Sequence, residues 1–132
     1  MNYEDMSDFE INKAVLLIQD VDDDIESITC RNTKLKCINS VAIVKFKGIE
    51  EPARFNPCNN PSDAWPIIVE NAISIQPVHD VAAGGYYKLS EIKYWTAWAT
   101  NRQSVDSFTE DKNPLRAAMI CFLKMKDAEN DR

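Results

Sequence analysis

Residues 55–71, with the sequence FNPCNNPSDAWPIIVEN, form the most distinctive stretch of this chain and decide how the rest is interpreted. Asn60 is suited to cap a helix, and Pro61 suits the first helical position, where its missing N–H has no intrahelical partner to lose. Asp63 then falls in the first turn, where a carboxylate faces the positive end of the helix dipole. The stretch therefore predicts that a helix begins directly after Asn60.

Pro66 is expected to interrupt this central helix. Proline has no N–H to donate, and its ring would clash with the carbonyl of Ser62, while Trp65 before it is disfavoured in helical angles. We therefore expect a short helix in two parts, followed by a strand over residues 73–78 that ends near Pro77.

Two further helices are predicted near the ends of the chain. Ser7 and Glu10 form a capping box, so that a helix should run to about residue 19. The pair Asn113 and Pro114 repeats the device seen at residues 60–61 and should start a last helix, to about residue 126. That helix is apolar almost all round, which predicts a buried position.

Residues 25–50 alternate between apolar and polar side chains and are rich in β-formers. We expect two or three strands there, with a turn at residues 32–33 and another at 39–40. Gly48 should end the last of them, and residues 51–54 should be a connection.

Residues 86–100 are aromatic and also favour strands. The glycine pair in residues 82–85 predicts a hairpin turn before them. Alternation along this strand would place Trp95 on one face and Trp98 on the other.

The order helix, strands, broken helix, strands, helix predicts the α+β class. We expect a single domain over residues 1–132, with an antiparallel sheet packed by an N-terminal helix, a short broken central helix and a buried C-terminal helix. A chain of 132 residues suffices for one core and is short for two. Residues 1–5 and 127–132 are expected to be disordered.

The net charge of −6 is distributed unevenly along the chain. Residues 1–26 hold 9 of the 21 acidic groups against Lys13 alone, so the remainder of the chain carries a small positive balance. Such an acidic segment repels phosphate backbones and could attract a basic protein surface, although a merely solvated face is the simpler alternative. Duplex nucleic acid is therefore not expected as a partner.

The four cysteines, at positions 30, 37, 58 and 121, match neither a metal knuckle nor a Cys-x-x-Cys motif, and His79 is the only histidine. We expect no metal and no cofactor. There is no apolar stretch long enough for a signal peptide or membrane helix, so we expect reduced thiols, a cytoplasmic location and no membrane partner.

Three blocks of sequence resemble the NinX family, small accessory proteins of lambda-like bacteriophages and prophages. They are residues 7–15 (SDFEINKAV), 58–68 (CNNPSDAWPII) and 113–119 (NPLRAAM), in the family's order. Residues 20–54 and 76–111 depart from the family pattern. The resemblance implies a phage gene expressed in an infected or lysogenic bacterial cell, and it supplies no catalytic residue.

A binding surface is predicted where the two proline-containing helix starts converge. Their backbone amides could hold an anion, and Arg116 could meet a carboxylate or phosphate. The tryptophans could stack on a base or enter a partner's groove. The candidate ligand- or partner-binding residues are Asn59, Asn60, Asp63, Trp65, Trp95, Trp98, Arg102 and Arg116. The structural alternatives are self-capping amides, tryptophans in the core, and an internal pair between Arg116 and Asp63.

These observations favour a non-enzymatic protein that binds a bacterial host protein, for instance a defence factor. A first alternative is a protein that sequesters a small nucleotide ligand acting as an immune signal, with aromatic side chains and Arg54, Arg102 or Arg116 as sandwich and clamp. A second alternative is an enzyme with an unrecognised site, for which a lone His79 offers little support. A homodimer through the apolar last helix is a further expectation.

Overall fold

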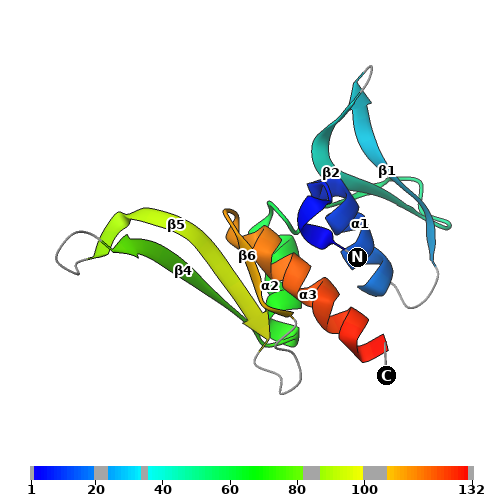
Figure 1. Ribbon diagram of the computed structural model, residues 1–132. Coiled ribbons are helices and arrows are strands. Elements are labelled where there is room, and N and C mark those ends of the chain that lie inside the picture. The colour runs from blue at the N-terminus through cyan, green and yellow to red at the C-terminus, as the bar shows by residue number, and fades with distance from the viewer. Residues whose placement is uncertain (1, 20–23, 34–35, 82–86, 100–106, 131–132) are drawn as a thin grey trace.

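The computed structural model describes residues 2–19, 24–33, 36–81, 87–99 and 107–130 (Figure 1). Within this part of the chain there are helices and two small antiparallel sheets. The helices and the second sheet form one hydrophobic core, and Phe55 of the first sheet packs against it. The α+β class predicted from the sequence is confirmed, with helices at the N-terminus, in the centre and at the C-terminus.

The first sheet has the strand order β1-β2-β3 and lies against the N-terminal helix. Its strand β2 turns Ala42 and Val44 into the interior, where they are almost fully buried. The elements of this half are η1 (Tyr3–Asp5), α1 (Asp8–Gln19), β1 (Ile25–Thr33), β2 (Lys36–Phe46) and β3 (Ala53–Phe55).

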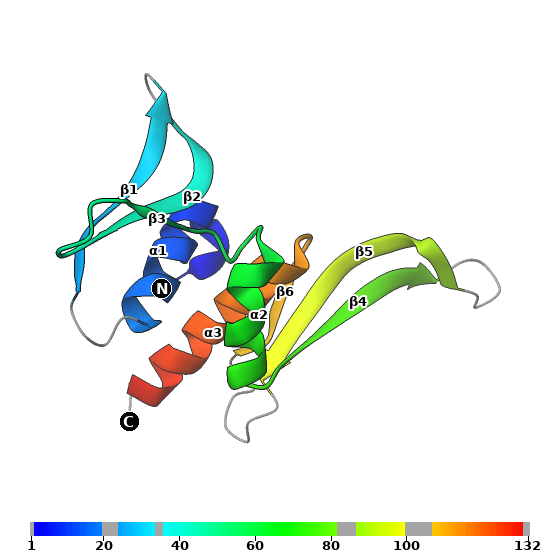
Figure 2. The same cartoon turned by 180° about the vertical axis from the view of Figure 1, so that it is seen from behind.

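The second sheet has the order β4-β5-β6, and its long β4–β5 hairpin extends away from the helices (Figures 1 and 2). The central helix α2 leads directly into β4. The elements of this half are α2 (Pro61–Glu70), β4 (Ile73–Val81), β5 (Tyr87–Ala99), β6 (Thr109–Asp111) and α3 (Pro114–Asn130).

Helix α3 runs between the two halves, with α1 on one side and the second sheet on the other (Figure 2). Its residues 117–123 are all at most 2% exposed, including Met119 and Phe122. Each fully buried large apolar side chain contributes about 1.5–3 kcal/mol, so this helix is the main source of core stability. The chain itself covers these side chains.

The structure contains two sheets where the sequence suggested one. The segment from Asn56 to Ala72 turns the chain away from β3 and through α2, so β4 begins at a different edge and pairs with β5. Strand β3 itself pairs with β2 over only three residues, Ala53–Phe55, in a segment expected to be a connection.

Helix α2 is continuous across Pro66, which corrects the expected break. Proline removes one hydrogen bond, to the carbonyl of Ser62, but both residues are exposed, so water can satisfy that oxygen. Ile67 and Ile68 are at most 5% exposed and hold the second half of the helix on the core. Packing therefore outweighs the local cost of the proline.

Two other strands are longer than expected. Strand β2 passes through residues 39–40 without a turn, and β4 continues beyond Pro77 to Val81. Since β4 is an edge strand, a residue without N–H is tolerated within it. The turn after β2 does occur at Gly48, which has a positive φ of 79°; the expected turn at residues 82–85 lies outside the described residues.

The two ends of the described chain, in η1 and α3, contact each other. Tyr3 in η1 is 6% exposed, and its hydroxyl donates a hydrogen bond to the carboxylate of Asp127 in α3. Burial, together with this hydrogen bond and the charge of Asp127, raises the pKa of Tyr3 to about 12. Lys124 donates to Glu4 over 2.6 Å and thereby lowers the pKa of that carboxyl group.

The cysteines differ in state. Cys58 and Cys121 are free and buried, whereas Cys30 is disulfide-bonded, which corrects the expectation of reduced thiols. Among the described helices, none has the length and apolar character needed to cross a membrane.

Candidate functional site

The start of α2 is capped from within the chain. The side-chain oxygen of Asn60 accepts from the amide of Ser62 at 3.0 Å, as the sequence predicted. The Asp63 carboxylate accepts from the backbone amide of Asn56 at 2.9 Å, which closes the corner before the helix. These two candidate binding residues therefore have structural partners.

Asn113 plays the same part at the start of α3. Its side-chain oxygen accepts from the amides of Leu115 at 2.9 Å and Arg116 at 3.4 Å. Its side-chain nitrogen donates to the carbonyl of Cys58 at 2.7 Å and to Asn59 at 3.2 Å. The two helix starts do converge, as expected, and hydrogen-bond to each other; together they are called the helix-start junction.

Arg116 crosses this junction and contacts the N-terminal segment. Its guanidinium donates to Asp8 at 2.5 Å, to Asp111 at 3.0 Å, and to the backbone oxygens of Met6 and Glu4 at 2.7 and 3.1 Å. Burial disfavours its charge, but the hydrogen bonds and charges of Asp8 and Asp111 outweigh burial and raise the pKa of Arg116. A pair with Asp63, considered from the sequence, is not formed: Asp8 and Asp111 are the partners.

Asn12 is a member of the junction that sequence reasoning missed. It lies on α1, is fully buried, and donates to Asn56 at 2.8 Å while accepting from the backbone amide of Cys58 at 3.1 Å. A signal was present, because Asn12 stands between the apolar residues Ile11 and Val15 on the buried face of its helix. A buried amide in that position needs partners.

The polar groups of the junction therefore form hydrogen bonds within the chain. The capped amides at residues 62, 115 and 116 already have acceptors, which removes the donors that an anion site would require. Asn59 is exposed, and its side-chain nitrogen donates to Asp8 at 3.0 Å. The arrangement is suited to joining segments of the chain.

The tryptophans are not brought together as one stacking platform. Trp95 and Trp98 are half-buried on β5, and their odd and even positions place them on opposite faces of the strand. Arg102, proposed as part of a clamp, lies outside the described residues. Arg54 is exposed on β3, and Arg116 is held by its four acceptors.

Trp65 has a different environment, because its side chain is 62% exposed on α2. Val69, one turn later, is 58% exposed, and Pro66 beside them is also exposed. At 100° per residue these three side chains share one side of the helix, while the buried Ala64, Ile67 and Ile68 hold the other. We call Trp65, Pro66 and Val69 the outer face of α2.

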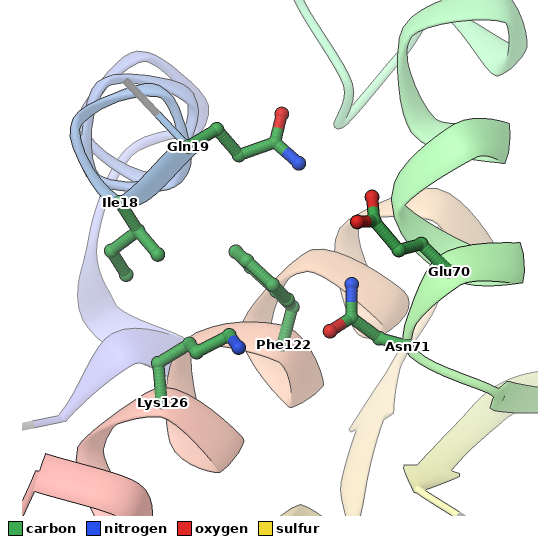
Figure 3. Close-up of a pocket in the computed structure, with 6 residues that line it drawn as sticks. All are labelled: Ile18, Gln19, Glu70, Asn71, Phe122 and Lys126. Atoms are coloured by element: carbon green, nitrogen blue, oxygen red, sulfur yellow. The ribbon is translucent and has the colours of Figure 1, made fainter. Parts of the chain in front are cut away.

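A pocket of about 440 Å³ opens where α1, α2 and α3 approach one another (Figure 3). Gln19 projects into it from the end of α1, and Glu70 from the end of α2 on the opposite side. Its lining residues are Ile18, Gln19, Glu70, Asn71, Phe122 and Lys126.

Among the described residues there is neither a cluster able to hold a metal ion nor an exposed free thiol. No three His, Cys, Asp or Glu side chains are grouped there so as to hold a metal ion. Cys58 is fully buried, and burial raises the pKa of its thiol, so it is not a reactive thiolate.

Comparison with known proteins places the chain in a family. The family model described as Bacteriophage P22, NinX matches residues 2–126 of 132. No curated protein and no solved structure matches the chain. The chain therefore belongs to the NinX family of bacteriophage proteins, as the three sequence blocks indicated.

Proposed function

We propose that this NinX-family chain is a non-enzymatic phage accessory protein that binds a bacterial host protein through the outer face of α2. The observation that supports this is the 62% exposure of Trp65 next to the 58% exposure of Val69. Tryptophan is enriched among the side chains that dominate binding energy at protein interfaces. The outer face is also rigid, because the capped start and the buried side of α2 fix its position.

The polar residues around α2 have internal roles, which leaves the apolar ones for a partner. Asn60 and Asp63 stabilise the corner before α2, and Ile67 and Ile68 lie in the core. The large side chain of Trp65, by contrast, is mostly exposed to solvent. An exposed apolar patch flanked by polar residues is typical of a protein-binding site.

The phage setting favours a host protein as the partner, met in the cytoplasm of an infected or lysogenic cell, and a defence factor is the version we favour. Nucleotide sequestration is less well supported, because the Arg116 guanidinium proposed as its clamp already has four acceptors. A buried, protonated Cys58 likewise gives no support to the enzymatic alternative.

Photo-crosslinking in bacterial cells tests the proposal. The full chain would carry p-benzoylphenylalanine at position 65 or 69, with position 49 as the matched control. Ile49 is 55% exposed on the turn after β2, so its apolar exposure is similar. We expect discrete covalent adducts with one host protein from positions 65 and 69 and none from position 49.

Equal adducts from all three positions would mean non-specific collision, and no adduct from any of them would overturn the proposal. A second arm compares phages carrying the natural gene, Trp65→Ala or Ile49→Ala on hosts with different defence systems. If a host factor is the target, the Trp65→Ala phage should resemble a phage that lacks the gene, and Ile49→Ala should not.

A thermal-shift panel of cyclic nucleotides and ADP-ribose separates the alternatives. A ligand-dependent rise in melting temperature without turnover would support sequestration instead.

A further inference from the structure

The lining of the pocket between the three helices carries one charge of each sign. Glu70 comes from the end of α2 and Lys126 from α3, and Figure 3 shows them on different sides of the pocket, with the Phe122 ring between them in that view. They do not form an ion pair with each other, since the carboxylate partner of Lys126 is Glu129. The two charges of the lining therefore balance and are held apart.

Both charges can be offered to a ligand. The Glu70 side chain is exposed and has no hydrogen-bond or ion-pair partner among the described residues. The Nζ atom of Lys126 lies 3.3 Å from a carboxylate oxygen of Glu129, whose side chain is 51% exposed. Such solvent-exposed pairs contribute little to stability, because water solvates both members well. The carboxylate of a ligand can therefore replace Glu129 as the partner of Lys126.

Two side-chain amides complete the polar part of the lining. The Asn71 side-chain nitrogen donates to the carbonyl of Ile67 at 2.8 Å, which directs its oxygen away as an acceptor, and Gln19 projects into the pocket from α1. The carbonyls of Ile67 and Val69 already accept from the backbone amides of Asn71 and Ala72. Recognition would therefore depend on side chains, and the two amides suit the N–H and C=O of a peptide group.

A ligand with only one kind of charge fits this lining poorly. An anion would meet the Glu70 carboxylate, and a cation would meet the Lys126 ammonium. A neutral apolar molecule would remove water from both charges without replacing its hydrogen bonds. A zwitterion, by contrast, gives each charge an opposite partner. The volume of about 440 Å³ lies within the usual range of small-molecule sites.

We infer that the pocket binds a small zwitterionic peptide of the dipeptide class; this inference does not depend on the proposed function. The ammonium group of the peptide contacts Glu70 and the side-chain oxygen of Asn71, and its carboxylate contacts Lys126. Its peptide group bonds to the amide of Gln19, and Ile18 supplies apolar surface for its methylene groups.

The test uses the full-length protein and four glycine peptides that differ only in their terminal charges. Glycylglycine carries both charges, glycylglycinamide only the ammonium, N-acetyl-glycylglycine only the carboxylate, and N-acetyl-glycylglycinamide neither. Binding is followed by NMR of the side-chain amides of Gln19 and Asn71. We expect glycylglycine to shift both signals and to bind about threefold or more tightly than either singly charged probe, with an advantage that decreases as salt is added.

Substitutions in the lining assign each terminal charge to one residue. Glu70→Gln should remove the preference for a free ammonium and keep the preference for a carboxylate, and Lys126→Gln should do the reverse. Glu129→Gln releases Lys126 and should tighten the binding of both carboxylate probes. Glu51→Gln removes an exposed acid outside the lining and serves as the matched control, with unchanged affinities.

Two results would overturn the inference. The first is equal affinity of the four probes for the wild-type protein, and the second is a preference for the free ammonium that survives in Glu70→Gln. The outcome is separable from that for the proposed function, because Trp65 does not line the pocket. Trp65→Ala should leave glycylglycine binding unchanged, and Glu70→Gln should leave crosslinking from position 65 unchanged.

Discussion

One part of the helix-start junction, at the start of α2, directly precedes the outer face of that helix, yet the side chains of the two regions have opposite environments. At the junction, Asn60, Asn113 and Arg116 are bound to other parts of the same chain. On the outer face, Trp65 and Val69 are left largely uncovered. The difference indicates that the polar residues of the motif hold the fold, whereas Trp65 and Val69 contribute little to it.

The largest expected effect is at Arg116. Arg116→Ala removes the donor for two carboxylates and two carbonyls, and should lower the free energy of unfolding by about 3 kcal/mol, as for a largely buried ion pair that loses one member. Urea denaturation measures this loss, with the exposed Lys112→Ala as control. Equal stability of the two variants would mean that the junction does not hold the fold.

Asn12→Ala should come next, with a loss of about 2 kcal/mol. The substitution leaves the buried amide of Cys58 and the side-chain oxygen of Asn56 without this partner. Chemical denaturation of Asn12→Ala against the exposed neighbour Lys13→Ala checks it. If only Lys13→Ala lowered the free energy of unfolding, Asn12 would not be the residue that stabilises the corner.

Tyr3→Phe tests a contact that belongs to neither region. It removes the hydrogen bond to Asp127 and should lower the free energy of unfolding by about 1.5 kcal/mol near neutral pH. Because folding raises the pKa of Tyr3 from 10.0 to about 12, its contribution is fully present below pH 10 and is lost as the pH rises towards 12. Denaturation curves across that range should show the wild type and Tyr3→Phe converging; parallel curves would contradict this assignment.

Asn60→Ala should cost about 1 kcal/mol, the usual value for a helix N-cap. Asn60→Asp retains an acceptor at the same position and serves as the matched control in thermal denaturation. If both variants were equally destabilised, the side-chain oxygen of Asn60 would not be the important group.

Trp65→Ala should have the smallest effect on stability, within about 0.5 kcal/mol, because the side chain is mostly in water. Its effect should be on partner capture alone. A large loss of stability in denaturation experiments would instead assign Trp65 to the fold and remove the contrast between the two regions.

Features that depend on nearby residues could be predicted from the sequence. The caps at Asn60 and Asn113 act within three residues of themselves, and the Ser7 hydroxyl meets the amide of Glu10 as the capping box requires. The α+β class also followed from the order of helical and strand patterns, which are local properties.

Features that depend on distant residues could not be predicted. Arg116 pairs with Asp8, which is 108 positions away, and no periodicity connects the two. The division into two sheets is decided by which strand edge the chain meets after α2. The exposure of Trp65 could not be predicted from the sequence either, because it depends on the orientation in which α2 buries Ile67.

Arg116 also has a consequence for cooperativity. One guanidinium on α3 joins the N-terminal segment of the first half to Asp111 at the end of β6 in the second. Either half expressed alone would leave charged groups without their counterparts and expose the apolar surface that α3 covers. We therefore expect the chain to unfold in a single transition, with all probes reporting the same midpoint.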